Sequence, residues 1–205
     1  MITIIDYGIG NLGSIKNMLK KAGVKSRISS TEEEIGEAEK LILPGVGAFD
    51  YGMSQLRNAV YFDTLNKRVQ EDKIPVLGIC LGAQLLTEGS EEGELPGLGW
   101  IKGRTIKFRE EKMDDKLKVP HMGWNEVETK KESRLFEDMY EEPRFYFVHT
   151  YHIKCEEERY VLVLSCYGYD FLAGVENENV VGVQFHPEKS HKYGLKLLTN
   201  FANNY

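Results

Sequence analysis

One cysteine of this sequence lies where the backbone would expose a nucleophile. Cys80 ends the apolar run Val76–Cys80 and has glycines two residues before and after it, Gly78 and Gly82. The spacing matches the G-x-S-x-G elbow, in which a strand turns sharply into a helix and the nucleophile occupies the strained turn. Glycines at these positions let the backbones of strand and helix pass closely. A cysteine here predicts acyl transfer, because a thiolate is a strong nucleophile once a neighbouring base lowers the thiol pKa.

A cysteine nucleophile needs a base, and one of the five histidines is placed to act as one. His186 follows the apolar run Val180–Phe185 and precedes Pro187, so it stands where a strand ends and cannot continue. Two residues further on, Glu188 would point the same way in an extended chain and could orient the imidazole. We therefore predict a catalytic triad of Cys80, His186 and Glu188.

Taken alone, each of these residues could have a packing role instead of a catalytic one. A lone buried cysteine is usually a small hydrophobe, and a short motif is only a hypothesis. Cys155 and Cys166 lie in β-rich runs without flanking glycines, so core packing is their expected role. A structural role is equally open for three further histidines, which are His121, His149 and His152. The cysteine elbow and the His-Pro-Glu sequence, each following its own apolar strand, together favour catalysis.

Composition indicates one globular domain that handles small molecules. The 205 residues suffice for one α/β core, residues 1–205, and 41% hydrophobic with 28% charged residues argues against disorder. A net charge of -6 without an arginine-rich stripe disfavours a nucleic-acid partner. Three cysteines without paired spacing predict no disulfide framework, no metal site and a reducing cytoplasm. No signal peptide, membrane span or cofactor is expected from the sequence.

The first half of the chain predicts a mainly parallel sheet covered by helices. Short apolar strands at 2–5, 40–43 and 75–79 alternate with helical stretches from Ser14 to Ala22 and from about Val60 to Val69. Such alternation is typical of βαβ units, whose functional residues gather at the carboxyl ends of the strands.

The second half predicts an antiparallel or mixed β extension. Strands are expected at 104–108, 145–148 and 160–164, and a hairpin joins 171–176 to 180–185 through a turn at 177–179. The charged stretch 110–118 is expected to be an exposed loop. A final helix from about Ser190 keeps one face apolar.

Several motifs together resemble one enzyme family. Gly78–Gln84 and Gln184–Glu188 resemble class I, triad-type glutamine amidotransferases, which hydrolyse glutamine to glutamate and ammonia. Within this family, four further segments are similar to the glutaminase subunits of imidazole glycerol phosphate synthases: Asp6–Asn11, Leu43–Phe49, Pro120–Asn125 and Phe185–Ser190. The resemblance extends over nearly the whole chain, and it implies the α/β fold of that family.

The resemblance also implies roles for individual residues. Cys80 corresponds to the nucleophile, His186 to the general base and acid, and Glu188 to the orienting carboxylate. Backbone groups of Leu81 and of the Pro44–Gly47 loop, at Gly47, would stabilise the oxyanion. The positions implied to hold glutamine are Gln84, Glu92, His149, Thr150 and Tyr151. Those implied to contact a partner are Asn11, Met122, Trp124 and Lys189, although a buried core role is an alternative for Trp124.

The implied partner is a separate (β/α)8-barrel cyclase that receives the ammonia, so we expect a heterodimer acting in histidine biosynthesis. An alternative is a paralogous subunit that supplies ammonia to a sugar amidotransferase of surface polysaccharide synthesis, since the segment Ser190–Gly194 resembles those proteins. A non-catalytic binding module of the same fold is disfavoured because every triad position is filled.

Overall fold

The computed structural model describes all 205 residues of the chain, Met1–Tyr205. The α-helices are α1 (Leu12–Lys21), α2 (Glu32–Gly36), α3 (Phe49–Arg57), α4 (Phe62–Gln70), α5 (Leu81–Leu85) and α6 (His191–Asn204). The strands are β1 (Ile2–Ile5), β2 (Ser26–Ser29), β3 (Lys40–Gly45), β4 (Val76–Cys80), β5 (Gly103–Lys107), β6 (His121–Glu126), β7 (Glu128–Thr129), β8 (Arg144–His149), β9 (Tyr151–Cys155), β10 (Val161–Tyr167), β11 (Tyr169–Asn177) and β12 (Val180–Val183). Short 3-10 helices lie at Glu110–Lys112, Arg134–Phe136, Glu158–Tyr160 and Pro187–Lys189.

A single large sheet runs through the molecule, parallel in one part and antiparallel in the other. Its order is β2-β1-β3-β4-β12-β11-β10-β7, and β9 pairs with both β11 and β5 beside this path. The pairs from β2 to β12 are parallel, whereas β12, β11, β10 and β7 pair antiparallel. The predicted α/β class, with a parallel sheet and a β extension, is confirmed.

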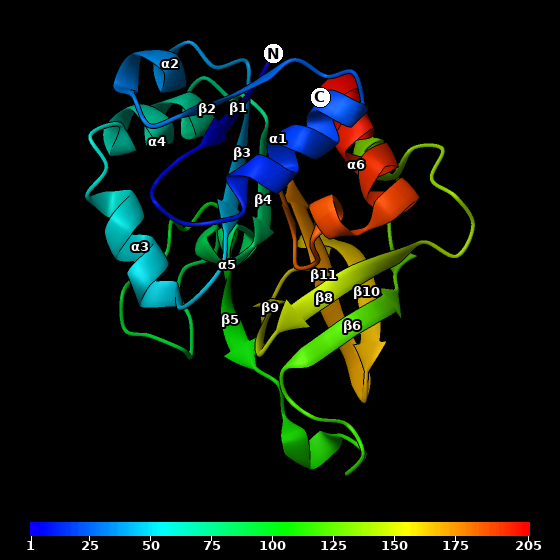
Figure 1. Cartoon of the computed structure of the whole chain (residues 1–205). Coiled ribbons are helices and arrows are strands. Elements are labelled where there is room, and N and C mark those ends of the chain that lie inside the picture. The colour runs from blue at the N-terminus through cyan, green and yellow to red at the C-terminus, as the bar shows by residue number, and fades with distance from the viewer.

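Both faces of the inner parallel strands β1, β3, β4 and β12 are buried, because helices cover each side (Figure 1). Along β1, Ile2 and Ile4 belong to one core cluster, whereas Ile5 belongs to the other. The first cluster includes residues of α1 and α6, and the second includes residues of α3, α4 and α5. Strands buried on both faces explain why the sequence shows continuous apolar runs here instead of an alternating pattern.

Strands β6 and β8 form a separate two-stranded antiparallel sheet. It crosses in front of β10 and β11 in Figure 1, with the start of α6 above it. Along β6 the exposed residues, among them Met122 and Trp124, alternate with more buried ones such as His121. One strand therefore has an inner face toward the core and an outer face toward solvent.

Most predicted elements are present, with differences at particular places. The chain contains α3, in which Phe49, Gly52, Met53 and Leu56 are buried, although no helix was predicted there. Val60, where the predicted second helix begins, is 77% exposed between α3 and α4. The charged stretch 110–118 is a loop with one 3-10 turn at its start, and the hairpin turn is two residues long because Asn177 pairs with Val180. None of the helices combines the length and the apolarity needed to cross a membrane.

Candidate active site

Cys80 lies on a strained turn between β4 and α5, as its glycine frame predicts. Its backbone has φ +53° and ψ -112°, a left-handed conformation that is unusual for a residue other than glycine. A Cβ atom on Gly82 would lie 1.9 Å from the carbonyl oxygen of Leu43, and one on Gly78 would lie 2.8 Å from the Cα atom of Ala83. Only glycine fits at either position, so the tight packing of β3, β4 and α5 depends on these two residues.

His186 follows β12, the strand that pairs in parallel with β4, so the carboxyl ends of these two strands lie side by side. Its Nδ1 is 2.8 Å from Oε1 of Glu188, and the two side chains are only 3% and 2% exposed. The triad prediction assumes an extended chain after His186. The chain forms the 3-10 helix Pro187–Lys189 there instead. Proline fixes φ near the helical value and begins the turn, which still returns the Glu188 carboxylate to the imidazole.

The surroundings of His186 favour its protonated form. Burial by itself lowers the pKa of this histidine, but the neighbouring Cys80 and the hydrogen-bonded Glu188 outweigh burial and raise the pKa to about 10. Nε2 of His186 is buried and makes no hydrogen bond.

A cavity of about 510 Å³ opens over this centre. Its lining contains ten of the residues implicated by the sequence: Gly47, Cys80, Leu81, Gln84, Glu92, His149, Thr150, Tyr151, His186 and Lys189. Glu188 lies behind His186 and takes no part in the lining. These residues come from elements spread over the whole chain, and the fold places them together at one edge of the parallel sheet.

Two backbone N–H groups at the cavity are free to meet a developing oxyanion. Leu81 is the first residue of α5, where backbone N–H groups have no acceptor within their own helix. Gly47 has φ +100°, is exposed and likewise has no acceptor for its N–H. A Cβ on Gly47 would meet nothing within 4 Å, so its glycine serves the backbone conformation and not close packing.

Gln84 and Glu92 both line the cavity and have different surroundings. The buried Nε2 of Gln84 donates to the carbonyl oxygen of Tyr151 and to Oε1 of Gln184, both at 3.0 Å. Oε2 of Glu92 accepts from the N–H of Phe49 at 2.9 Å, at the first residue of α3, and the residue remains exposed. Glu92 therefore keeps carboxylate oxygen available to a cation in the cavity.

Gln184 is a residue of this site to which the sequence analysis assigned no role. It is fully buried, and its Nε2 donates to Sγ of Cys80 at 3.8 Å while its Oε1 accepts from Gln84. The signal in the sequence is a polar side chain at the end of the apolar run Val180–Phe185, two residues before His186. Such a residue must find partners once it is buried.

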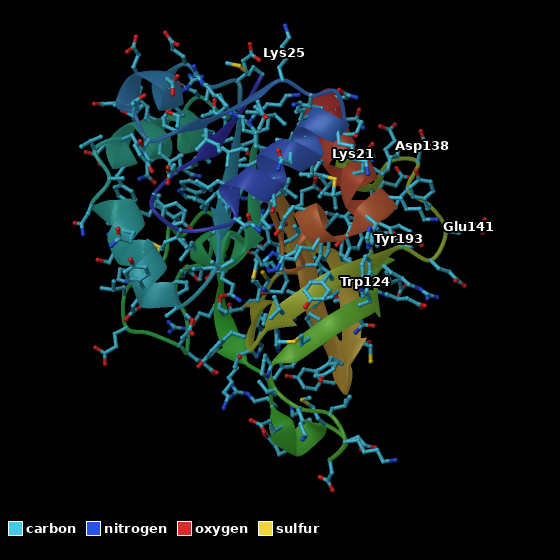
Figure 2. All side chains as sticks on the ribbon, viewed as in Figure 1. Lys21, Lys25, Trp124, Asp138, Glu141 and Tyr193 are labelled. Atoms are coloured by element: carbon cyan, nitrogen blue, oxygen red, sulfur yellow. The ribbon has the colours of Figure 1, made fainter.

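The four residues predicted to contact a partner are accessible, and two of them are large and apolar. Met122 is 62% exposed and Trp124 is 46% exposed, so the alternative of a core role for Trp124 is wrong. Trp124 projects from β6 toward α6 (Figure 2), where its ring stacks on His191 at 5.3 Å. Lys189 places its Nζ 5.5 Å from the centre of the Tyr146 ring, and Asn11 caps α1 by accepting from the N–H of Ser14.

The remaining cysteines and the acidic residues form no metal site. Cys155 and Cys166 are free thiols, and no group of three or more His, Cys, Asp or Glu side chains could hold a metal ion. Cys166 is exposed and not packed in the core, because β10 lies toward the edge of the sheet and its side chains alternate between the two faces. The chemistry available at the cavity is that of a thiol, an imidazole and a carboxylate.

A cysteine on a strand-to-helix elbow, next to a buried His–Glu pair, defines an enzyme class that works through a covalent acyl intermediate. Comparison with known proteins identifies the family: the model for class-I glutamine amidotransferases matches residues 3–204. The chain belongs to this family of enzymes.

Curated proteins with high sequence identity to the chain are subunits of imidazole glycerol phosphate synthases. The chain is 52% identical to imidazole glycerol phosphate synthase subunit HisH 2 of Methanococcus maripaludis over 98% of both chains. It is 50% identical to the subunit HisH 2 of Pseudomonas aeruginosa over 98% of both chains, and 46% identical to the subunit HisH of Leptospira borgpetersenii over 99% of this chain and 100% of that one.

Solved structures share the fold at much lower sequence identity. A structure described as PurLQS from Thermotoga maritima superposes with a TM-score of 0.74 at 20% identity, covering 99% of this chain and 97% of that one. A structure described as a glutamine amidotransferase has a TM-score of 0.71 at 21% identity, covering 96% of this chain and 98% of that one.

Proposed function

We propose that the chain is the glutaminase subunit of an imidazole glycerol phosphate synthase and that it hydrolyses glutamine with Cys80, His186 and Glu188. The observation that carries the proposal is the cysteine at φ +53°, held at the same cavity as a histidine whose Nδ1 lies 2.8 Å from a buried carboxylate. The names of the curated relatives support the choice of synthase. Residues 1–205 act as a single glutaminase domain in this proposal.

The reaction proceeds through a thioester. The thiolate of Cys80 attacks the side-chain amide carbon of glutamine, and the tetrahedral oxyanion accepts hydrogen bonds from the N–H groups of Leu81 and Gly47. The carbon–nitrogen bond breaks as His186 gives its proton to the leaving ammonia. A water molecule, deprotonated by His186, then attacks the γ-glutamyl thioester and releases glutamate and the thiolate. Glu188 holds the imidazole in place and stabilises its charged form.

The walls of the cavity hold the amino-acid part of the substrate. Glu92 is the proposed partner of the α-ammonium group, since its carboxylate is exposed at the cavity. Gln84 and the segment His149–Tyr151 form another part of the lining, where Gln84 donates to the carbonyl oxygen of Tyr151. These five positions are the substrate contacts in this proposal.

The ammonia is delivered to a separate (β/α)8-barrel cyclase, which forms imidazole glycerol phosphate and AICAR in histidine biosynthesis. Asn11, Met122, Trp124 and Lys189 are the proposed contacts of this partner, and the complex is a cytoplasmic heterodimer. Free thiols at all three cysteines are compatible with that compartment. None of the relatives named above is described as a subunit of a sugar amidotransferase, so the polysaccharide alternative has no support from them.

The test is glutamine hydrolysis by the complex of this chain with its cyclase partner, measured as ammonia and glutamate released. We expect Cys80→Ala to abolish release while the complex still forms. Cys166→Ala removes another accessible thiol and serves as the matched control, with activity retained. Ammonia release by Cys80→Ala at the wild-type rate would refute the triad. An intact activity of the chain without any partner would refute the coupling to the synthase.

A further inference from the structure

A chain of hydrogen bonds connects the inner face of β6 with the wall of the cavity. His121 and His149 lie directly opposite each other on β6 and β8, and Nδ1 of His121 is 3.0 Å from Nε2 of His149. Nδ1 of His149 is 2.7 Å from the carbonyl oxygen of Tyr151. That same oxygen accepts from Gln84, which in turn contacts Gln184 beside Cys80.

The Tyr151 carbonyl oxygen determines which atom donates in each of the hydrogen bonds made by His149 and His121. A carbonyl oxygen can only accept, so Nδ1 of His149 must carry the proton that it shares with Tyr151. His149 is buried and its pKa lies well below the usual value, chiefly because of desolvation, so the ring is neutral and its Nε2 is an acceptor. The donor to that acceptor must then be the Nδ1–H of His121.

The other end of the chain agrees with this assignment. Burial lowers the pKa of His121 to about 4, so this ring is neutral too and its Nε2 is an acceptor. Nδ2 of Asn125 lies 3.4 Å from that nitrogen and also donates to the carbonyl oxygen of Cys166 at 2.7 Å. Asn125 has two N–H groups and can serve both acceptors at once.

We propose that His121 is a positioning residue for glutamine hydrolysis, which locks His149 in its Nδ1–H tautomer and thereby fixes the Tyr151 carbonyl and Gln84 at the cavity wall. The inference rests on the proposed function of the cavity. Without the His121 donor, His149 can move its proton to Nε2, and an unprotonated Nδ1 would then face the lone pairs of the Tyr151 carbonyl. The segment 149–151 would shift away from Gln84, and the substrate wall would lose its fixed position.

Two substitutions of His121 separate the hydrogen bond from packing. The His121 ring stacks between Phe147 and Tyr167, with ring centres 4.8 and 4.1 Å away. His121→Phe keeps an aromatic ring in this stack and removes the donor. His121→Asn removes the ring and keeps an N–H donor close to the place of Nδ1. If His121 acts by fixing the tautomer of His149, His121→Phe loses this effect and His121→Asn retains it. If His121 acts only by packing, His121→Phe retains its role and His121→Asn loses it.

The experiment combines kinetics of the complex with nitrogen NMR of the chain labelled at histidine. In the wild type, the ring spectrum is expected to show His149 protonated at Nδ1. In His121→Phe we expect the Nε2–H tautomer of His149 to appear and the KM for glutamine to rise about tenfold, the equivalent of one buried hydrogen bond, with a smaller change in kcat. His121→Asn is expected to restore both toward the wild type.

An Nε2–H tautomer of His149 in the wild type would overturn the proposal. So would an unchanged KM in a folded His121→Phe, or a KM that rises in His121→Asn and not in His121→Phe. Thermal unfolding of each variant shows whether it is folded. The tautomer is read without turnover, so a failure of the proposed function, seen as no glutamine hydrolysis by the wild-type complex, is distinguishable from a failure of the lock.

Discussion

His152 is a buried residue whose ring is tied up in contacts outside the proposed chemistry. Its ring centre lies 4.9 Å from that of Phe108, Nδ1 lies 3.1 Å from the carbonyl oxygen of Ile153, and Nε2 lies 3.1 Å from the hydroxyl of Tyr169. Desolvation lowers its pKa to about 4, although the hydrogen bond to Ile153 acts in the opposite direction. The same residue type is thus pushed in opposite directions in one protein, because Cys80 and Glu188 outweigh burial at His186, whereas burial outweighs the attraction of Glu91 at His152.

This difference predicts acid destabilisation through His152. The unfolded chain binds the proton near pH 6.5 and the folded chain only near pH 4, so stability is complete above pH 6.5 and is lost as the pH falls through this range. Between pH 7.5 and pH 5 we expect His152 to contribute a loss of about 2 kcal/mol in the free energy of unfolding. His152→Gln removes the titration and should lose that much less over the same interval, as measured by urea unfolding at both pH values. Equal losses in the two proteins would contradict the assignment.

At the scale of elements, the crossing of β3, β4 and α5 holds Cys80 in its strained conformation. A methyl group on Gly82 would collide with the Leu43 carbonyl, which belongs to backbone and cannot rotate away. We expect Gly82→Ala to lower the free energy of unfolding by about 3 kcal/mol and to reduce glutamine hydrolysis, because relief of the clash must move β3 or the elbow.

The matched control is Gly13→Ala in the first turn of α1, where a Cβ meets nothing within 4 Å. Alanine in an open helical position should be neutral or stabilising by about 0.5–1 kcal/mol. Urea unfolding of the two variants beside the wild type tests the contrast. A Gly82→Ala protein as stable as Gly13→Ala would show that the elbow tolerates a side chain.

The same elements show which parts of the structure can be predicted from sequence. Glycine spacing predicts the elbow because the steric requirement is local and absolute, and the strand ends predict where His186 lies. Strand β2 escapes prediction since it is an edge strand of polar composition, Ser26–Ser29, whose pairing with β1 is not visible in its own residues. Gln184 and the His121–His149 pair escape because their roles depend on contacts between residues far apart in the chain.

At the scale of the whole molecule, the two-stranded sheet of β6 and β8 contributes residues both to the cavity and to the proposed partner surface. The outer face of β6 presents Met122 and Trp124, whereas the inner face carries His121. Met122 and Trp124 are exposed on the same face of β6, and methionine and aromatic residues are enriched at protein interfaces. Docking on the outer face would therefore act on a strand that also supports the substrate wall.

Trp124 allows the partner surface to be tested directly. The protein has two tryptophans, and the other one, Trp100, is 5% exposed and donates to Asn66. We expect Trp124→Ala to weaken the complex with the cyclase about 10- to 100-fold in Kd, because large aromatic side chains at the centre of an interface contribute most of its energy. Val60→Ala truncates a more exposed apolar side chain, 77% accessible between α3 and α4, and should leave Kd unchanged.

Fluorescence provides a second measurement of the same contact. In a Trp100→Phe background, the emission of Trp124 should shift to shorter wavelength as a partner without tryptophan is added, since the indole leaves water on docking. Titration by calorimetry gives Kd for both truncated variants. A Kd of Trp124→Ala equal to that of Val60→Ala, with no shift of the emission, would place the partner on another face of the molecule. A weakened complex that keeps the KM for glutamine would instead show that docking and the substrate wall are independent, even though β6 carries residues of both.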